Sequence, residues 1–245
     1  KKAKKNLKKI KQLNNVPTKF KKFYESYFLN QIQKFPFIDA KIAISKDYFT
    51  VNKQQKWITN HRSRRVGHLI RSKYDCIVST SSSINKDNSL LNCRIDGLNN
   101  YKPDLIIIDR HLKLKNKLRL IKLSKNRKTY IFTLSNNDKK ISFFKKKKIK
   151  IIQINKLEDL NDFKKLFLKI FKLGNGRILV ETGLKFLNQL LKFNYINNLY
   201  IFKSSKFLKN KGANYSDINL IKTLKLRNKI KVNLDGDELF QIRVK

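Results

Sequence analysis

The sequence predicts an α/β fold with a central, mostly parallel, twisted sheet flanked by helices and an antiparallel hairpin at the C-terminus. First, short apolar runs alternate with stretches of helical spacing from residue 37 onward, the pattern of strand–helix units. Second, 40% of the 245 residues are apolar, including 17 Phe and 9 Tyr, which is enough to bury a core. Third, an Asp-Gly-Asp turn joins two runs near the end of the chain, as in a hairpin.

The expected strands are compact apolar runs bounded by polar or turn residues. The first of them follows Pro36 and is expected to be buried. In order, the expected strands are residues 37–45, 76–80, 105–109, 129–134, 148–154, 177–181 and 199–203. The hairpin is expected to pair residues 229–234 with residues 238–244 around the turn at 235–237.

The expected helices are marked by capping residues and by apolar periodicity. Thr59 and Asn60 can accept hydrogen bonds from free backbone N–H groups, which predicts a helix through Ser72. Apolar residues at helical spacing predict a second helix over residues 157–173, ended by Gly174 in the left-handed conformation. Residues 183–193 are expected to form a third helix.

Residues 1–34 are expected to be a linker with a short helix, leading into a domain over residues 35–245. They open with a lysine-rich run, and Pro36 ends the pattern that follows it. Aromatic residues spaced like one face of a helix lie between the two: Phe20, Phe23, Tyr24, Tyr27 and Phe28. Because the sequence contains no Met, we expect it to be a piece of a longer protein.

The formal net charge of +41 suggests nucleic-acid binding, but composition offers a simpler cause. Lysines outnumber arginines 47 to 11, and residues with AT-rich codons are abundant throughout, as expected from codon drift. No apolar run is long enough for a membrane span, and no signal peptide opens the chain. We therefore expect a cytoplasmic protein whose partners include neither membrane nor nucleic acid.

Several common sites are absent from the sequence. There is no glycine-rich dinucleotide fingerprint, no phosphate loop and no zinc deaminase signature. The two cysteines match no zinc spacing, so no metal is expected. His61, His68 and His111 have no companion at catalytic spacing and are expected to be surface or packing residues.

Two candidate segments lie at the ends of expected strands in the first half of the chain. Lys41 and Ala43 share one face of the first strand, where the small Ala43 side chain would let a flat ring approach, and Trp57 precedes a helix cap. Residues 79–83 carry only hydroxyl side chains directly after a strand, which suits phosphate or ribose. Both segments also fit plain structural roles, as a core strand and a polar loop.

Arginines and a later strand end complete the candidate residues. Arg71 and Arg94 flank the hydroxyl run, and a planar guanidinium pairs well with phosphate. A third segment ends a strand in Glu181 and opens a helix at Gly183, whose free N–H groups and dipole favour an anion. Surface arginines and strand–glycine–helix turns are common, so the structural alternative stays open here too.

Taken in order, these segments resemble the reductase domain of the bifunctional riboflavin-biosynthesis deaminase/reductase family, which has a dihydrofolate-reductase-like fold. The resemblance runs from about Pro36 to the C-terminus and rests on KIAISKD, KWIT, the helix ending in Arg71, SSSINKDNSLLNCR, DLIIID and ILVETG. It implies NADPH-dependent reduction of 5-amino-6-(5-phosphoribosylamino)uracil to its phosphoribitylamino counterpart. It also implies a homodimer and a deaminase domain upstream of Lys1 in the parent chain.

The resemblance implies roles for individual residues as well. Lys41 and Glu181 are the implied catalytic pair, holding the sugar hydroxyls and stabilising or relaying the proton that opens the sugar ring. Arg71 and Arg94 would bind the substrate phosphate. The implied substrate-binding residues are Lys41, Gln55, Arg71, Leu91, Arg94 and Glu181. The implied cofactor-binding residues are Ala43, Trp57, Ser83, Asp87, Gly183, Leu184, Lys185, Phe186, Leu187, Asn188 and Gln189.

The sequence departs from the family pattern in four places. Tyr48 replaces a turn glycine, Asn88 and Ser89 replace Asp-Pro, Thr182 stands inside the Glu–Gly turn, and Arg110 replaces a serine. Arg110 suits the adenosine 2′-phosphate of NADPH. Two alternatives from other classes are a basic nucleic-acid-binding module and a degenerate reductase domain that serves only in assembly. The loss of the turn glycine favours the second of these.

Overall fold

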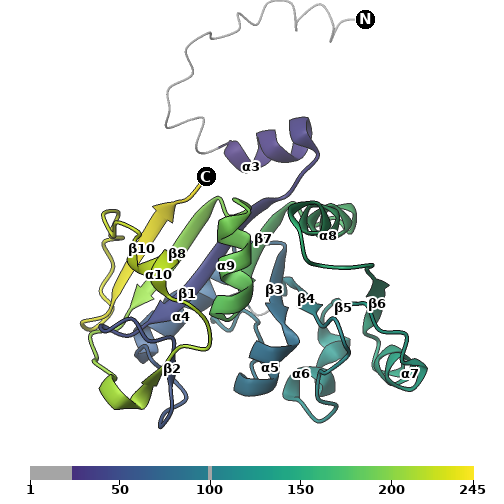
Figure 1. Cartoon of the computed structure of the whole chain (residues 1–245), viewed down its shortest axis with the longest axis horizontal. Helices are drawn as coiled ribbons and strands as arrows, with labels where there is room; N and C mark the ends of the chain where they lie inside the picture. Colours follow the sequence, from purple (N-terminus) through teal and green to yellow (C-terminus); the bar gives the residue numbers. More distant parts are fainter. Residues whose placement is uncertain (1–23, 99–100) are drawn as a thin grey trace, which may run out of the picture.

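The computed structural model describes residues 24–98 and 101–245, which build one large sheet covered by helices (Figure 1). The sheet has eight strands in the order β10-β8-β1-β7-β3-β4-β5-β6, and β10 alone runs antiparallel to its neighbour. The strands are β1 (Phe37–Ile44), β3 (Cys76–Thr80), β4 (Asp104–Ile108), β5 (Thr129–Thr133), β6 (Lys150–Gln153), β7 (Arg177–Glu181), β8 (Asn198–Lys203) and β10 (Glu238–Arg243). A two-stranded ribbon pairs β2 (Val51–Asn52) with β9 (Gly212–Ala213).

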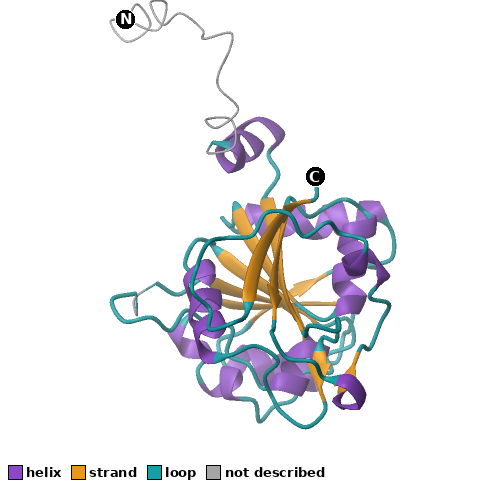
Figure 2. Cartoon of the chain, turned by 90° about the vertical axis from the view of Figure 1, so that its left-hand side faces the viewer, coloured by secondary structure: helices purple, strands orange, loops and turns teal. Residues whose placement is uncertain are grey.

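Helices lie on both sides of the sheet (Figure 2). Those on one side are α4 (His61–Arg71), α5 (Ser81–Asp87), α6 (Arg119–Lys122) and α7 (Asp138–Lys146). Those on the other are α8 (Leu160–Lys172), α9 (Leu184–Lys192) and α10 (Asn219–Lys222). Short turns of helix at Leu29–Gln33, Ser124–Asn126 and Lys209–Lys211 complete the set, together with α3 (Glu25–Phe28).

The strands are apolar along their whole length because both faces of the sheet are buried. In β4, Leu105 and Ile107 pack with α5, α6 and α7 in one hydrophobic cluster. Ile106 and Ile108 point the other way, into the cluster formed with α8 and α9. Successive side chains of a strand alternate between faces, so one apolar run supplies two cores. The predicted α/β class with a mostly parallel sheet is confirmed.

Local capping and turn chemistry also follow the sequence. The Asn60 Oδ1 atom accepts from Ser63 N at 2.9 Å and caps α4, and Gly174 takes φ +94° after α8. Helix α5 differs from the polar loop that the composition of residues 81–87 predicts. The signal was present in Thr80, whose side chain accepts from the Ser83 N–H and caps the helix.

The expected C-terminal hairpin forms only in part. β10 pairs along its full length with β8, whereas residues 229–234 meet it through one bridge between Lys229 and Phe240. Residues 231–233 are exposed, and two of the three are the polar Lys231 and Asn233, so apolar burial favours a longer ladder there only weakly. The turn itself is present, with Asp235 and Gly236 both at positive φ.

The described part of the N-terminal segment is helical from Glu25 to Gln33 and ends at Lys34, at φ 50°. Phe20 and Phe23, which were expected on the same helix face, lie outside the described residues. Within the ranges that the structure describes, no helix is both long enough and apolar enough to cross a bilayer.

Candidate functional site

The candidate residues lie at the carboxyl ends of three neighbouring strands. β7 lies between β1 and β3, and its Glu181 is directly in register with Lys41 of β1. Arg71 is the last residue of α4, which packs on the same end. Ligands of open α/β sheets bind outside the carboxyl ends of the strands, so this is the expected position for a site.

A lysine, a glutamate and an arginine form the inner part of the site. Arg71 holds Glu181 with both arms of its guanidinium, Nε to Oε1 at 2.5 Å and Nη2 to Oε2 at 2.9 Å. Lys41 Nζ lies 3.9 Å from Glu181 Oε2 and 5.3 Å from the centroid of the Phe202 ring. The Glu181 side chain is only 9% exposed. A buried carboxylate is thus paired with two cations.

The charges of these groups set their protonation. Burial favours the neutral form of Glu181, but the charge and hydrogen bonds of Arg71, together with Lys41, outweigh it and lower its pKa to about 2. Burial lowers the pKa of Lys41, and the nearby Arg71 adds to this, while Glu181 opposes it. At neutral pH the site therefore holds an ionised glutamate beside a lysine that releases its proton more readily than usual.

The loop after α5 brings Leu91 and Arg94 to the same place. Leu91 is buried at φ 49°, and Arg94 is exposed with Nη2 2.9 Å from His68 Nε2. Arg127 holds this loop through two backbone carbonyls. Its Nη1 donates to Leu91 O at 2.8 Å, and its Nη2 donates to Leu90 O. Burial, followed by the charge of Arg71, lowers the pKa of Arg127 to about 10.

A second cluster, made of hydroxyls, lies beside the start of α9. Thr80 Oγ1 is 3.1 Å from Ser83 Oγ and 3.2 Å from Thr182 Oγ1, which joins the ends of β3 and β7. Ser83 Oγ accepts from Gly183 N at 3.0 Å. Thr182, a departure from the family pattern, is thus part of the network rather than an obstruction. The exposed Gly183 leaves the first turn of a nine-residue helix open to an anion.

The other cofactor candidates on α9 differ in what they can offer. Lys185 is exposed and Gln189 is half-buried. The side chains of Leu184, Phe186, Leu187 and Asn188 are buried. The Leu187 N–H donates to Gly183 O at 3.2 Å, so among these four residues only Leu184 and Phe186, in the first turn, have backbone N–H groups that the helix does not use.

Several candidates stand apart from these two clusters. Trp57 is 48% exposed, with Lys56 and Arg64 each 5.1 Å from its ring centroid, and the neighbouring Gln55 is exposed. Asp87 ends α5 and is exposed. Ala43 lies on β1 two residues after Lys41 and packs against the cluster that contains Phe202.

Arg110 is exposed directly after β4 because Asp109 builds the loop beneath it. Asp109 Oδ1 accepts from Ser81 Oγ and Lys113 N, both at 2.8 Å, and Oδ2 accepts from Leu114 N at 2.8 Å. This carboxylate is therefore fully used by the protein, and the free cation at this strand end is Arg110.

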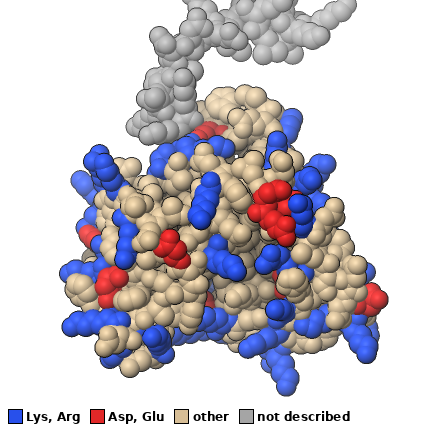
Figure 3. All heavy atoms as spheres, in the orientation of Figure 1, with Lys and Arg blue, Asp and Glu red and all other residues tan. Residues whose placement is uncertain are grey.

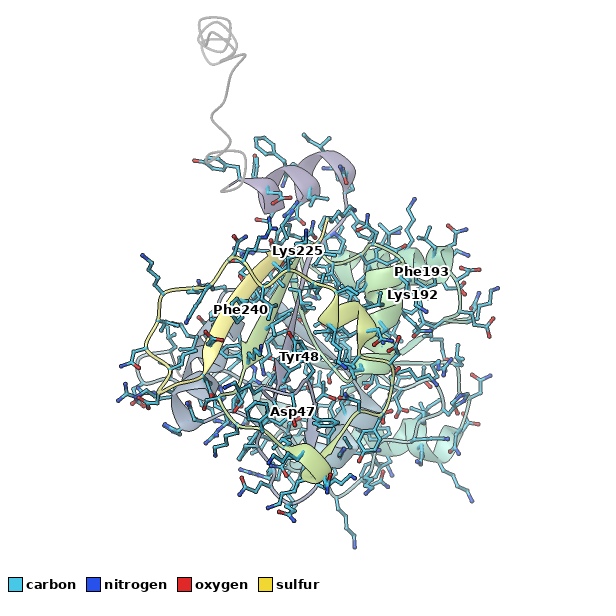
Figure 4. All side chains as sticks on the ribbon, turned by 60° about the vertical axis from the view of Figure 1, so that its left-hand side comes forward. Asp47, Tyr48, Lys192, Phe193, Lys225 and Phe240 are labelled. Atoms are coloured by element: carbon cyan, nitrogen blue, oxygen red, sulfur yellow. The ribbon has the colours of Figure 1, made fainter. Side chains whose placement is uncertain are left out.

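Two departures from the family pattern adopt positive φ angles. Tyr48, in the loop after β1 (Figure 4), has φ 65°, the conformation that a glycine takes at little cost. The adjacent Asp47 holds this loop by accepting from Lys209 N at 2.8 Å. Asn88 has φ 45°, and asparagine tolerates this region better than most residues. The chain thus keeps the turn shapes without the glycine.

Sequence reasoning missed three contributors to the site. His68 was expected to be a packing or surface residue, yet it contacts both arginines. Arg127 was not singled out at all, and Thr80 was noted only as one member of the hydroxyl run at residues 79–83. His68 precedes Arg71 by three residues, which places both side chains on one helix face, and that spacing was the available signal.

The chain is similar in sequence to known proteins. Residues 36–237 match the family model described as the RibD C-terminal domain. Riboflavin biosynthesis protein RibD of Buchnera aphidicola subsp. Baizongia pistaciae is 31% identical over 235 residues, covering 87% of this chain and 62% of that protein. The RibD protein of Aquifex aeolicus is 26% identical over 218 residues, covering 87% and 59%. The chain spans about three-fifths of the length of these curated relatives.

Solved structures share the fold. Acinetobacter baumannii RibD superposes with a TM-score of 0.73 at 17% identity, covering 92% of this chain and 62% of that one. The Saccharomyces Riboflavin Biosynthesis Reductase Rib7 gives a TM-score of 0.67 at 22% identity, covering 92% and 99%. The fold that the resemblance implied is confirmed. By the match over residues 36–237, the chain belongs to the family of RibD C-terminal domains.

Proposed function

We propose that this domain, over residues 35–245, reduces 5-amino-6-(5-phosphoribosylamino)uracil to 5-amino-6-(5-phosphoribitylamino)uracil with NADPH. The observation that carries the proposal is the Lys41–Glu181–Arg71 cluster, with its buried carboxylate and two partly exposed cations, next to the start of α9. The family match supports it, and so does the length of Rib7, a protein named as a reductase and covered to 99% by this chain.

The residues present fit a dinucleotide phosphate. Gly183 and Lys185 are exposed at the start of α9, where the positive end of the helix dipole favours an anion, and a Cβ at position 183 would meet only Ser83 Oγ, at 3.5 Å. Gly183, Ser83 and Lys185 would hold the pyrophosphate, Arg110 the 2′-phosphate, and Ala43, Trp57 and Asp87 the rest of the cofactor. When bound, NADPH supplies the hydride that reduces the anomeric carbon of the ring-opened sugar.

Lys41 and Glu181 have different roles in the opening of the sugar ring. Glu181, with a pKa of about 2, stays ionised and accepts hydrogen bonds from the sugar hydroxyls. Lys41 Nζ is 3.9 Å from the carboxylate, too far for a normal hydrogen bond, so its N–H donors remain available. Because burial lowers its pKa, Lys41 can release a proton to the ring oxygen as the C–O bond opens.

Arg71 and Arg94 bind the phosphate, with Leu91 and Gln55 against the rest of the substrate. Arg71 is committed to Glu181 on one side, which links the phosphate end of the substrate to the sugar end. Holding a bound geometry is worth roughly 7–11 kcal/mol in the best cases, so positioning can supply much of the catalysis.

The test measures NADPH oxidation with the phosphoribosylaminouracil substrate. The wild type is expected to turn over, Lys41→Met and Glu181→Gln to lose at least about a hundredfold in kcat, and Lys172→Met, an exposed lysine at the end of α8, to match the wild type. Absence of NADPH oxidation and of NADPH binding in the wild type would favour a domain used only for assembly. Normal turnover in both site variants would refute the roles of Lys41 and Glu181.

The nucleic-acid alternative gains little support from the charge distribution. Lys and Arg are scattered over the face shown in Figure 3, with other residues between them, instead of forming one stripe. We further propose a cytoplasmic homodimer, in a parent chain that carries a deaminase domain before Lys1. This proposal rests on the resemblance and on the remaining length of the RibD relatives.

A further inference from the structure

His68 occupies the space between the two arginines proposed to bind phosphate. It lies on α4 one turn before Arg71 and is 8% exposed. Its Nε2 atom is 2.9 Å from Arg94 Nη2. Its Nδ1 atom is 2.8 Å from Asn92 O, 3.2 Å from Arg94 N and 3.3 Å from Arg71 Nη1. No role has been given to this ring so far.

The neighbours of the ring determine its tautomer. A guanidinium only donates hydrogen bonds, so the Nε2 atom that faces Arg94 must be the unprotonated acceptor. On this assignment the proton lies on Nδ1 and is donated to Asn92 O at 2.8 Å, while the Arg94 backbone N–H, which also faces Nδ1, is farther away at 3.2 Å. A doubly protonated ring would turn an N–H toward the Arg94 guanidinium and place a third positive charge there.

The same environment keeps the ring neutral. The charged groups around it are Arg71 on its own helix, Arg94 on the facing loop and Glu181 at the end of β7. Burial, then Arg71 and Arg94, lower the pKa of His68 to about 4, although Glu181 acts in the opposite direction. The neutral ring accepts from one arginine, and the carbonyl to which it donates also accepts from Arg71 Nη1 at 3.0 Å.

The two arginines are held in different ways. Arg71 is largely buried, and Glu181 and Asn92 O accept from three of its five N–H donors, which leaves one on each Nη atom for a ligand. Arg94 is exposed, and apart from His68 its guanidinium has one contact, Nη1 to the Asn92 side chain at 3.3 Å. A long exposed side chain explores many rotamers unless a partner restrains it. His68 Nε2 is the closest restraint on Arg94.

We propose that His68 is a positioning residue for phosphate recognition, whose neutral ring accepts a hydrogen bond from Arg94 and so aligns that guanidinium with Arg71 toward the substrate phosphate. The proposal rests on the proposed function, because it needs a phosphorylated substrate in this site. It adds a residue that acts through Arg94 and does not touch the reacting atoms. The neutral ring lies between the guanidinium groups of Arg71 and Arg94 and adds no third positive charge.

The test compares three variants of the whole chain with a matched control. His68→Asn keeps a donor near Asn92 O but does not reach Arg94, whereas the longer His68→Gln places its Oε1 atom where Nε2 was. His68→Leu removes both hydrogen bonds. The control is His61→Leu, an exposed histidine at the start of the same helix. The substrates are the phosphoribosylaminouracil and the same compound without its phosphate.

We expect KM for the phosphorylated substrate to rise about tenfold in His68→Asn and His68→Leu, with a smaller change in kcat, because a charge-assisted hydrogen bond is lost. His68→Gln is expected to recover most of this loss, and His61→Leu to match the wild type. For the dephosphorylated substrate, KM should be the same in all five proteins. If His68→Leu does not fold, His68→Asn and His68→Gln still decide the question.

Two outcomes would overturn the proposal while leaving the reductase function intact. One is wild-type KM for the phosphorylated substrate in His68→Asn. The other is an equal rise in KM for both substrates, which would mean that the ring merely supports the fold of the loop. A wild-type protein that turns over neither substrate would instead reject the proposed function, so the two failures are distinguishable.

Discussion

Replacing Glu181 with glutamine tests how strongly the buried ion cluster stabilises the fold. The side chain is 9% exposed, and Arg71 holds both of its oxygens. Lowering a glutamate pKa from its ordinary value of about 4.3 to about 2 corresponds to roughly 3 kcal/mol of stability at neutral pH. Glutamine keeps the shape but leaves Arg71 without its counter-charge, for which losses of about 3–5 kcal/mol are typical. We therefore expect Glu181→Gln to unfold about 3 kcal/mol more easily.

The stability difference between the wild type and Glu181→Gln should depend on pH in a defined direction. A carboxylate with a lowered pKa stabilises the folded state above the unfolded-state pKa, and that stability is lost as pH falls through the folded-state value. The difference between wild type and Glu181→Gln should be constant above about pH 5 and shrink between about pH 4.3 and 2. Glutamine does not titrate, so the change of this difference with pH comes from the wild-type protein.

Urea unfolding followed by circular dichroism between about pH 2 and 8 measures this difference. Thermal unfolding at pH 7 should show Tm lower by roughly 6–12 °C, from about 2–4 °C for each kcal/mol in a chain of this size. Glu158→Gln, an exposed glutamate, is the matched control and should change stability by less than about 0.5 kcal/mol. A loss below about 1 kcal/mol at pH 7 in Glu181→Gln, or a difference that stays constant down to about pH 2.5, would refute the reasoning.

Three further predictions concern the rest of the site. Gly183→Asp should raise Tm slightly, because aspartate caps α9, but it should weaken NADPH binding at least about tenfold by repelling the phosphates. The control Gly183→Ser adds a capping side chain without the charge. Equal Kd values for NADPH in the two variants, measured by Trp57 fluorescence, would count against an anion site there. Arg127→Met removes the donors that hold the loop at Leu91, so the free energy of unfolding, measured in urea, should fall by about 2–3 kcal/mol and KM for the phosphoribosylaminouracil should rise. Lys125→Met, at an exposed lysine, should change neither quantity. Arg110→Ala should raise KM for NADPH several-fold but not KM for NADH, and a parallel rise in both would exclude contact with the 2′-phosphate.

Local patterns were enough to place the polar groups that end each strand. Apolar runs with polar ends predicted β1, β3 and β7, and with them the positions of Lys41, Glu181 and Gly183. These predictions succeed because burial on both faces forces a continuous apolar run, and because capping depends on residues a few positions apart. The same local reasoning failed at residues 229–234, where the apolar pattern continues but the chain lies exposed at an edge.

Strand order could not be obtained in this way. β1 and β3 are consecutive long strands in the sequence, yet β7, some hundred residues later, lies between them. That insertion puts Glu181 in register with Lys41 and within reach of Arg71 on α4. Which strands pair is decided by the packing of the whole sheet, and the apolar runs are too similar to one another to encode it.

The fold class, the strand ends that carry polar residues and the resemblance from which the roles of Lys41, Arg71, Arg94 and Glu181 are proposed could all be read from the order of the residues. The pairing of Glu181 with Arg71 and the position of His68 between the two arginines became visible in the folded chain. The reason is physical: periodicity reports whether a position is buried, whereas a pKa or a hydrogen bond depends on which distant group lies within a few ångströms of it.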